Sequence, residues 1–262
     1  MDGRFGTAAL LTTAVVALAL AGEWSARAQS ALETSMEARF QLDLHVSDSA
    51  LNPMLPAGFV LNVAAQGPAK DANLRAIFVD RITVNGPDGR AVGRGSGRFV
   101  YLAAPVKDPA GTNAQLVVGG LVDDATAAPG PFGVYLPAAM YAMQRTSSAS
   151  NGGSAIDSQD WSFQAASGER LELHIKYAHG VGNRANPSET KVYSAKTPQV
   201  FQLWRQEQVL DILRNATTNP PDRVMEFSFK GGGGSYAKLF DGTEKPLSWD
   251  NVVWLNRTIV AP

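Results

Sequence analysis

The lysines are the first side chains to consider for chemistry, because a desolvated lysine can attack a carbonyl group and form an imine. Seven of the eight lysines lie among polar residues or at the ends of predicted strands. The exception is Lys176, which lies within the alternating segment 171–177. That alternation places Lys176 on the face opposite the apolar residues. The pattern favours a solvent-facing lysine, with an imine-forming lysine as the alternative.

An acid and two arginines on one predicted strand are the second candidate. Residues 74–84 alternate as a strand does, and Asp80 falls on the apolar face while Arg75 and Arg81 fall on the opposite face. A buried carboxylate costs several kcal/mol unless it is paired or hydrogen-bonded. We therefore expect a structural ion pair at Asp80, with a functional carboxylate as the alternative.

The remaining reactive residue types form no recognisable catalytic or metal site. The three histidines, His45, His174 and His179, do not have the spacing of a metal-binding pair, and the chain has no cysteine. Gly95-Ser96-Gly97 lacks the outer glycine spacing of a nucleophile elbow. We predict no catalytic residue, no metal and no cofactor from these patterns.

The stretch 124–145 carries no ionised side chain between Asp124 and Arg145. Such a segment belongs in an interior or against a ligand, because burial of apolar surface contributes roughly 25 cal/mol per Å². Its prolines and glycines exclude a continuous membrane helix. Pro137 suits the first position of a helix. The sequence therefore predicts a turn followed by a buried helix over 137–144.

The amino-terminal residues have the pattern of a signal peptide. Arg4 precedes the apolar run 8–21, and Ala26-Arg27-Ala28 places small residues where a signal peptidase cleaves, which predicts cleavage before Gln29. An uncleaved anchor is the alternative. We expect an exported protein, periplasmic or secreted, with a single domain over 29–262 and no later membrane span. A net charge of −1 does not suggest nucleic acid as a partner, and the absence of cysteine favours a bacterial periplasm.

The elements that would position these residues are mostly strands. Apolar alternation and turn residues predict strands over 36–46, 59–65, 74–84, 97–106, 114–122, 161–165, 171–177, 224–230, 236–240 and 252–260. Ser47 or Ser49 can cap a short helical turn, and Thr197-Pro198 opens the strongest predicted helix, which runs to Arg214. The fold class is α+β, mostly antiparallel β.

The order of these pieces resembles the acetoacetate decarboxylase-like family. The segment from Ser49 to Gly58, with its Leu-Asn-Pro-Met-Leu-Pro, is similar to an early helix end of that family. Gly130 and Pro137 have the spacing of its glycine and its Pro-Lys-Lys, one of whose lysines forms the imine. This chain has Pro131-Phe132 in place of the family's Arg-Glu and Ala138-Ala139 in place of Lys-Lys. Alanine cannot form an imine.

The resemblance implies a cone-like β-barrel with a few flanking helices and a pocket beside Pro137. We expect an exported, non-catalytic protein that binds a small, largely apolar molecule. Its expected ligand-binding residues are Phe132, Tyr135, Met140 and Tyr141 as a wall and Arg75, Asp80 and Arg81 as polar anchors. One alternative is an enzyme of altered mechanism that uses Lys176 or the Asp80–Arg81 pair. Another is a periplasmic structural or partner-binding protein. The sequence leaves the oligomeric state open.

Overall fold

A computed structural model describes residues 30–129, 133–151, 153–214 and 223–262. The predicted signal peptide and Phe132 lie outside the described residues. The strands are β1 (Ala31–His45), β2 (Val60–Leu61), β3 (Leu74–Asn85), β4 (Gly97–Lys107), β5 (Asn113–Val122), β6 (Tyr135–Ser148), β7 (Ile156–Ala165), β8 (Arg170–Ala178), β9 (Asn183–Arg184), β10 (Ser188–Ser194), β11 (Phe201–Arg214), β12 (Val224–Gly232) and β13 (Lys245–Val260). The helices in these ranges are α1 (Asp48–Leu51) and the 3₁₀ turns η1 (Asn52–Met54), η2 (Ala125–Ala127) and η3 (Gly234–Tyr236).

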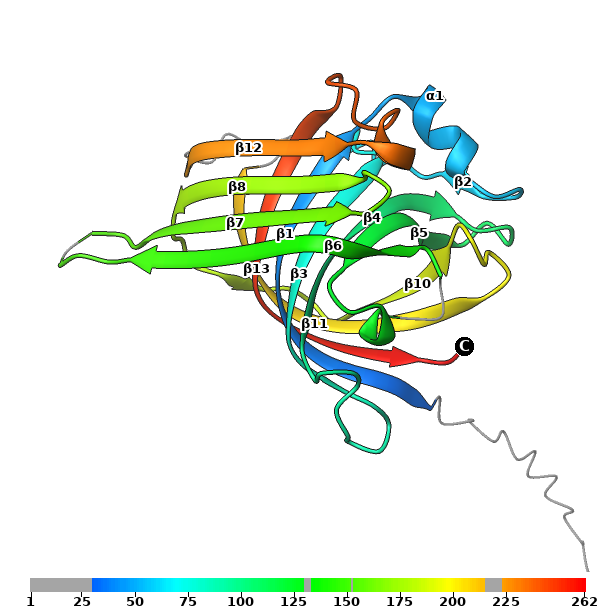
Figure 1. Ribbon diagram of the computed structural model, residues 1–262, viewed down its shortest axis with the longest axis horizontal. Coiled ribbons are helices and arrows are strands. Elements are labelled where there is room, and N and C mark those ends of the chain that lie inside the picture. Colours follow the sequence, from blue (N-terminus) through cyan, green and yellow to red (C-terminus); the bar gives the residue numbers. More distant parts are fainter. Residues whose placement is uncertain (1–29, 130–132, 152, 215–222) are drawn as a thin grey trace, which may run out of the picture.

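Seven strands close into a barrel. Their order is β5-β10-β11-β13-β1-β3-β4, and pairing of β4 with β5 closes the ring (Figure 1). All of these pairs are antiparallel except β5 with β10. Closure removes the free edges that an open sheet of this size would expose. The barrel interior, which we call the lumen, is therefore enclosed by strands on every side.

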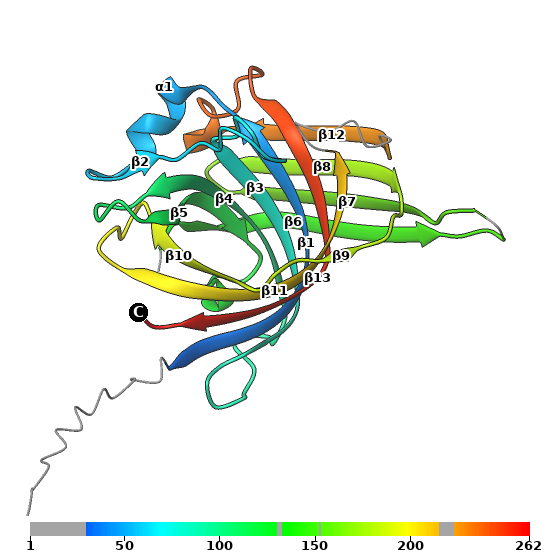
Figure 2. The same cartoon turned by 180° about the vertical axis from the view of Figure 1, so that it is seen from behind.

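A second sheet, β6-β7-β8-β12, branches from β5. Gly120, Leu121 and Val122 of β5 pair in parallel with Tyr135, Leu136 and Pro137 of β6, after which β6 pairs with β7. The four strands run across β1, β3 and β13, as both Figure 1 and Figure 2 show. This crossing covers the outer face of the barrel on one side.

Two apolar cores result, one on each face of the barrel wall. On β3, Ala76 and Phe78 face the core between the two sheets, while Ile77 and Val79 face the lumen. The adjacent strand β4 alternates in the same way. Strands buried on both faces are apolar along nearly their whole length. That requirement explains the continuous apolar run at the centre of β3.

Most predicted strands and hairpins are confirmed, and the fold class is confirmed with them. The hairpin of β3 and β4, the hairpin of β7 and β8, and the short helical turn after Ser47 are all present. No helix within the described residues is long and apolar enough to cross a membrane. The predicted strand 236–240 is wrong, because residues 234–236 form the 3₁₀ turn η3 and a turn follows. The predicted strand 59–65 is reduced to the two residues of β2.

Both longer helix predictions are wrong. Residues 137–144 belong to strand β6, and residues 201–214 form strand β11. In β11, register shifts after Val209 and after Ile212 change the side-chain alternation, so that its apolar spacing imitates a helix. Pairing with β5 and β7 holds β6 extended. The stretch 124–145 is also less buried than predicted, because Met140 is 62% exposed and Tyr141 is 43% exposed.

Candidate functional site

Three of the residues predicted to bind ligand face the lumen: Arg75, Arg81 and Tyr135. The Tyr135 ring packs edge-on against Phe99, with 6.0 Å between ring centroids. A Cβ at Gly120 would lie 2.7 Å from this ring, so glycine is required for Tyr135 to enter the barrel. Burial raises the pKa of Tyr135, and its hydroxyl has no hydrogen-bond partner among the described residues.

The other predicted residues lie elsewhere. Asp80 faces the second sheet and pairs with Arg98 at 3.0 Å, which is the structural ion pair that the sequence favoured. Met140 and Tyr141 lie on β6, outside the barrel. The Lys176 amine is exposed and pairs with Glu226 at 2.8 Å. The residues predicted to form the pocket wall are therefore separated. Among those that the structure describes, Tyr135 lies inside the lumen, whereas Met140 and Tyr141 lie outside the barrel.

A cluster of charged side chains fills the part of the lumen beside Tyr135. Glu37 contacts Arg257 at 2.7 Å and Arg39 at 2.6 Å, and Arg81 contacts the neighbouring carboxylate, Glu33, at 2.7 Å. The guanidinium of Arg257 also lies 4.3 Å from the centroid of Trp204, within cation–π distance. We call Glu33, Glu37, Arg39, Arg81 and Arg257 the lumenal cluster.

Three cations and two carboxylates give the lumenal cluster a net positive charge. Burial alone would raise the pKa of Glu37, but Arg257 and Arg39 outweigh it and hold the pKa at about 2. Glu37 is therefore ionised at every physiological pH. Nε of Arg81 and both Nε and Nη1 of Arg257 have no hydrogen-bond partner within the described residues.

A second polar group lies at the end of the barrel where β3 begins. Arg75 and Asp43 are directly opposite each other on β3 and β1, and Arg75 Nε donates to Asp43 at 2.8 Å. Asp250 follows on β13, where the Ser248 hydroxyl donates to its carboxylate at 3.1 Å. Burial, and then the negative charge of Asp43, raise the pKa of Asp250 to about 7. We call Asp43, Arg75 and Asp250 the mouth group.

A cavity of about 330 Å³ opens beside the mouth group. Arg75 lines it together with Gln115 of β5 and Thr190 of β10, and residues 62–72 supply part of its rim. Volumes of roughly 300–1,000 Å³ are typical of small-molecule sites. Of the mouth group, Arg75 lines the cavity, and its guanidinium can bind a carboxylate. Glu189 of β10 is the acidic side chain in the lining.

Comparisons with known proteins agree with this architecture. No family model and no curated protein matches the sequence. The structure is similar to an acetoacetate decarboxylase-like enzyme from Sphingomonas wittichii RW1, with a TM-score of 0.54 and 14% identity over 88% of this chain and 91% of that chain. It is also similar to the enduracididine biosynthesis enzyme MppR complexed with pyruvate, with a TM-score of 0.52 and 13% identity over 90% of this chain and 91% of that chain.

The chain has the acetoacetate decarboxylase-like fold. The resemblance stated from the sequence is therefore confirmed for the fold. In this acetoacetate decarboxylase-like barrel, Ala138 lies opposite Ala165 of β7 and packs against the apolar core between the sheets. Ala139 is exposed at a register shift of β6. None of the eight lysines is buried, and all of them lie within the described residues.

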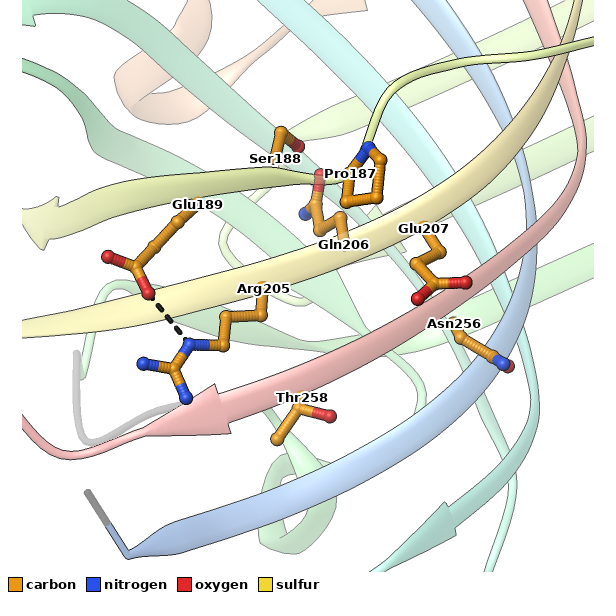
Figure 3. Close-up of a pocket in the computed structure, with 8 residues that line it drawn as sticks. All are labelled: Pro187, Ser188, Glu189, Arg205, Gln206, Glu207, Asn256 and Thr258. Atoms are coloured by element: carbon orange, nitrogen blue, oxygen red, sulfur yellow. Dashed lines mark hydrogen bonds and ion pairs between the residues drawn. The ribbon is translucent and has the colours of Figure 1, made fainter. Parts of the chain in front are cut away.

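The outer face of the barrel carries a further groove, of about 540 Å³, over β10, β11 and β13 (Figure 3). Its charged lining includes Arg205 and Glu189, which pair at 2.7 Å and are both about half exposed. Exposed ion pairs contribute little to stability. Within the described residues no group of three His, Cys, Asp or Glu side chains is arranged to hold a metal ion. The mouth cavity is therefore the better candidate site.

The raised pKa of Asp250 predicts a specific pH dependence of stability. The unfolded chain loses this proton near pH 4, whereas the folded chain keeps it up to about pH 7. The contribution of Asp250 to the free energy of unfolding is therefore fully present below pH 4 and is lost as the pH rises to 7. Asp250→Asn should flatten that fall and stabilise the protein at pH 8, by at most about 4 kcal/mol.

Urea unfolding between pH 4 and pH 8 measures this effect. Asp88→Asn removes a carboxylate from an exposed loop and is the control for a change in net charge. If Asp250→Asn and the unmodified protein lose the same stability between pH 4 and pH 8, the interpretation of the mouth group is wrong.

Proposed function

We propose that this is an exported protein that binds a small carboxylate-bearing molecule in the mouth cavity and forms no imine with it. The polar lining of that cavity changes the ligand class from the largely apolar molecule expected from the sequence. A ligand that carries a carboxylate would match the guanidinium of Arg75, because the two groups have complementary planar geometry.

The position and partners of Arg75 are the observation that carries this proposal. Its side chain is 30% exposed at the mouth cavity, whereas that of Asp43 is 2% exposed. The bond to Asp43 uses Nε, and Asp43 is the ion-pair partner of Arg75 within the described residues. The two terminal nitrogens are the natural donors to a ligand, because a guanidinium can donate two parallel hydrogen bonds to one carboxylate.

The surroundings of the lysines support the second part of the proposal. An imine-forming lysine must lose its proton near neutral pH, which requires burial or a neighbouring cation. Lys176 instead pairs with Glu226, and Lys191 pairs with Asp108 at 3.4 Å. The two positions that the resemblance aligns with the family's Lys-Lys are Ala138, which packs against an apolar core, and Ala139, which is exposed.

The alternative enzyme mechanisms receive less support. Asp80 pairs with Arg98, and Arg81 pairs with Glu33 at 2.7 Å in the lumenal cluster. Each of these groups already has an opposite charge as its partner. The proposed export depends on the signal-like residues 1–28, and amino-terminal sequencing of the exported protein should begin at Gln29.

Titration calorimetry with pyruvate tests the mouth site. Pyruvate is a suitable probe because it is a small carboxylate and because the similar enzyme MppR was solved with it. We expect the protein to bind pyruvate and Arg75→Gln to weaken that binding roughly 10- to 100-fold, the range for loss of a charged hydrogen bond. The control, Arg90→Gln, removes an exposed arginine from the β3–β4 loop and should change affinity less than about twofold.

Two results would contradict the mouth site. One is equal affinity of Arg75→Gln and the unmodified protein for pyruvate. The other is the absence of measurable binding at millimolar pyruvate, with circular dichroism showing that the protein is folded.

A further inference from the structure

A second cavity, of about 380 Å³, lies between the barrel and the second sheet, away from the mouth. Ala38 of β1 and Asn251 and Val253 of β13 line its barrel side. The opposite side is lined by residues of β6, β7, β8 and their connections: Arg145, Ser147, Ala155, Asp157, Gln159, Tyr177 and His179. We call this cavity the seam pocket, because it lies where the two sheets separate.

The side chains on the inner face of β7 change from apolar to polar at the seam pocket. Trp161 and Phe163 lie in the apolar core between the sheets, but the next two residues on that face, Gln159 and Asp157, are polar and also buried. A buried polar group costs free energy unless it is hydrogen-bonded. Apolar side chains at these two positions would simply extend the core. Polar groups at the cavity therefore indicate a binding role rather than packing.

These polar groups form a connected network. The Gln159 amide donates to the Tyr177 hydroxyl at 3.0 Å and to the Asn251 carbonyl oxygen at 3.2 Å, and it accepts from the Trp161 indole at 3.1 Å. The network links β7, β8 and β13, and all four of its side chains are buried. Such a network holds its members in fixed orientations. The wall of the seam pocket is therefore preorganised.

His179 and Asp157 supply a proton acceptor. Nδ1 of His179 lies 2.7 Å from Oδ2 of Asp157. An ionised carboxylate only accepts hydrogen bonds, so Nδ1 carries a proton, and in the neutral form of the imidazole Nε2 is then an acceptor. A ligand that contacts Nε2 must therefore donate a hydrogen bond, as a hydroxyl group does.

Arg145 supplies a positive charge on the same wall. It lies on β6 opposite Gln159 of β7, two residue pairs along the ladder from the Ser147–Asp157 pair. Its carboxylate neighbour, Asp80, is 3.7 Å away and already pairs with Arg98 at 3.0 Å. One carboxylate therefore faces two guanidinium groups. Arg145 can therefore still bind an anionic ligand group, although Asp157 also lines the pocket.

We propose that the seam pocket binds a small hydroxy acid, with its carboxylate on Arg145 and its hydroxyl donating to His179. Arg145 lies on β6 and His179 directly follows β8, with β7 between them, and both side chains line the same pocket. A small hydroxy acid in this pocket is therefore expected to contact both. This site is independent of the mouth site, because the two cavities share no lining residue.

Lactate and propionate are matched probes, because they differ by the hydroxyl group alone. The imidazole signals of the three histidines can be followed by nitrogen-correlated NMR, and His179→Gln assigns the signal of His179. We expect one enantiomer of lactate to shift the His179 signal. We expect propionate to bind at least about fivefold more weakly, because it leaves Nε2 without a donor.

Three variants locate the binding. Arg145→Gln should weaken lactate binding roughly tenfold or more, as loss of a charged hydrogen bond predicts. Val253→Trp should weaken it similarly by filling the pocket, and it alters only an exposed side chain that is 42% accessible. Arg75→Gln, at the mouth, should leave the lactate affinity that is read at the His179 signal within about twofold.

The proposal is overturned if neither lactate enantiomer shifts the His179 signal, or if propionate binds as well as lactate. It is also overturned if lactate binding survives in both Arg145→Gln and Val253→Trp. Loss of lactate binding in Arg75→Gln alone would assign lactate to the mouth cavity instead. That last outcome would support the mouth site and contradict the seam site. The experiment therefore distinguishes failure of one proposal from failure of the other.

Discussion

Glu37→Gln should lower the free energy of unfolding by about 3–5 kcal/mol, the range measured when one partner of a buried ion pair is removed. Glu37 is completely buried and contacts two guanidinium groups, those of Arg39 and Arg257, which are also buried. The neutral amide would leave three lumenal arginines with Glu33 as the remaining carboxylate of the cluster. Urea unfolding at pH 7 measures the loss.

The control for Glu37→Gln is Glu189→Gln, because Glu189 also pairs with an arginine but on the exposed face of the barrel. That change should cost less than about 1 kcal/mol. A loss below 1 kcal/mol for Glu37→Gln as well would show that the lumenal cluster is not a tightly coupled buried network.

The same carboxylate gives a pH signature. Its pKa is about 2 in the folded protein and near 4.5 when unperturbed. Its contribution to stability is therefore present above pH 4.5 and is lost as pH falls toward 2. Part of the acid sensitivity of the unmodified protein should disappear in Glu37→Gln.

Phe163→Ala should cost about 3–5 kcal/mol and should loosen the second sheet from the barrel. Phe163 is fully buried in the core between the sheets, 6.5 Å from the ring of Trp161 and 6.2 Å from that of Tyr141. Removing it leaves a cavity at the centre of that core. Urea unfolding and hydrogen exchange of β6, β7 and β8 measure the two effects.

Tyr141→Ala is a matched control, because Tyr141 is the cross-strand partner of Phe163 and stacks on the same ring. Tyr141 is 43% exposed, so its loss should cost about 1 kcal/mol, close to the value of one aromatic pair. Equal losses for the two variants would mean that packing between the sheets contributes little to stability.

The hairpins could be predicted from the sequence because their signals are local. Asn85-Gly86-Pro87-Asp88-Gly89 is turn chemistry between two apolar runs, and Ser167-Gly168 lies between two alternating ones. The structure has strands on both sides of each turn. The branch of β6 from β5 could not be predicted, because it depends on pairing between strands and on Gly120 making room for Tyr135.

The lumenal cluster was missed because its pattern looks like a solvent-facing strand. In the predicted strand 36–46, Phe40 and Leu42 share the apolar face, and Arg39, Gln41 and Asp43 alternate with them. Alternation alone assigns the polar face to water. Closure of the barrel instead turns that face into the lumen, where Arg39 and Asp43 are buried. The signal that could have revealed the cluster was the mixture of acidic and basic residues on the polar face of this strand.

The most direct test of the central claim is reductive trapping with acetoacetate and borohydride, read by intact mass. A lysine imine would be reduced to a stable adduct, whereas a complex held by Arg75 at the mouth would leave the protein mass unchanged. We expect the unmodified mass alone, because the eight lysines are all at least partly exposed. An adduct that peptide mapping places on one lysine, and that pyruvate protects, would contradict the claim.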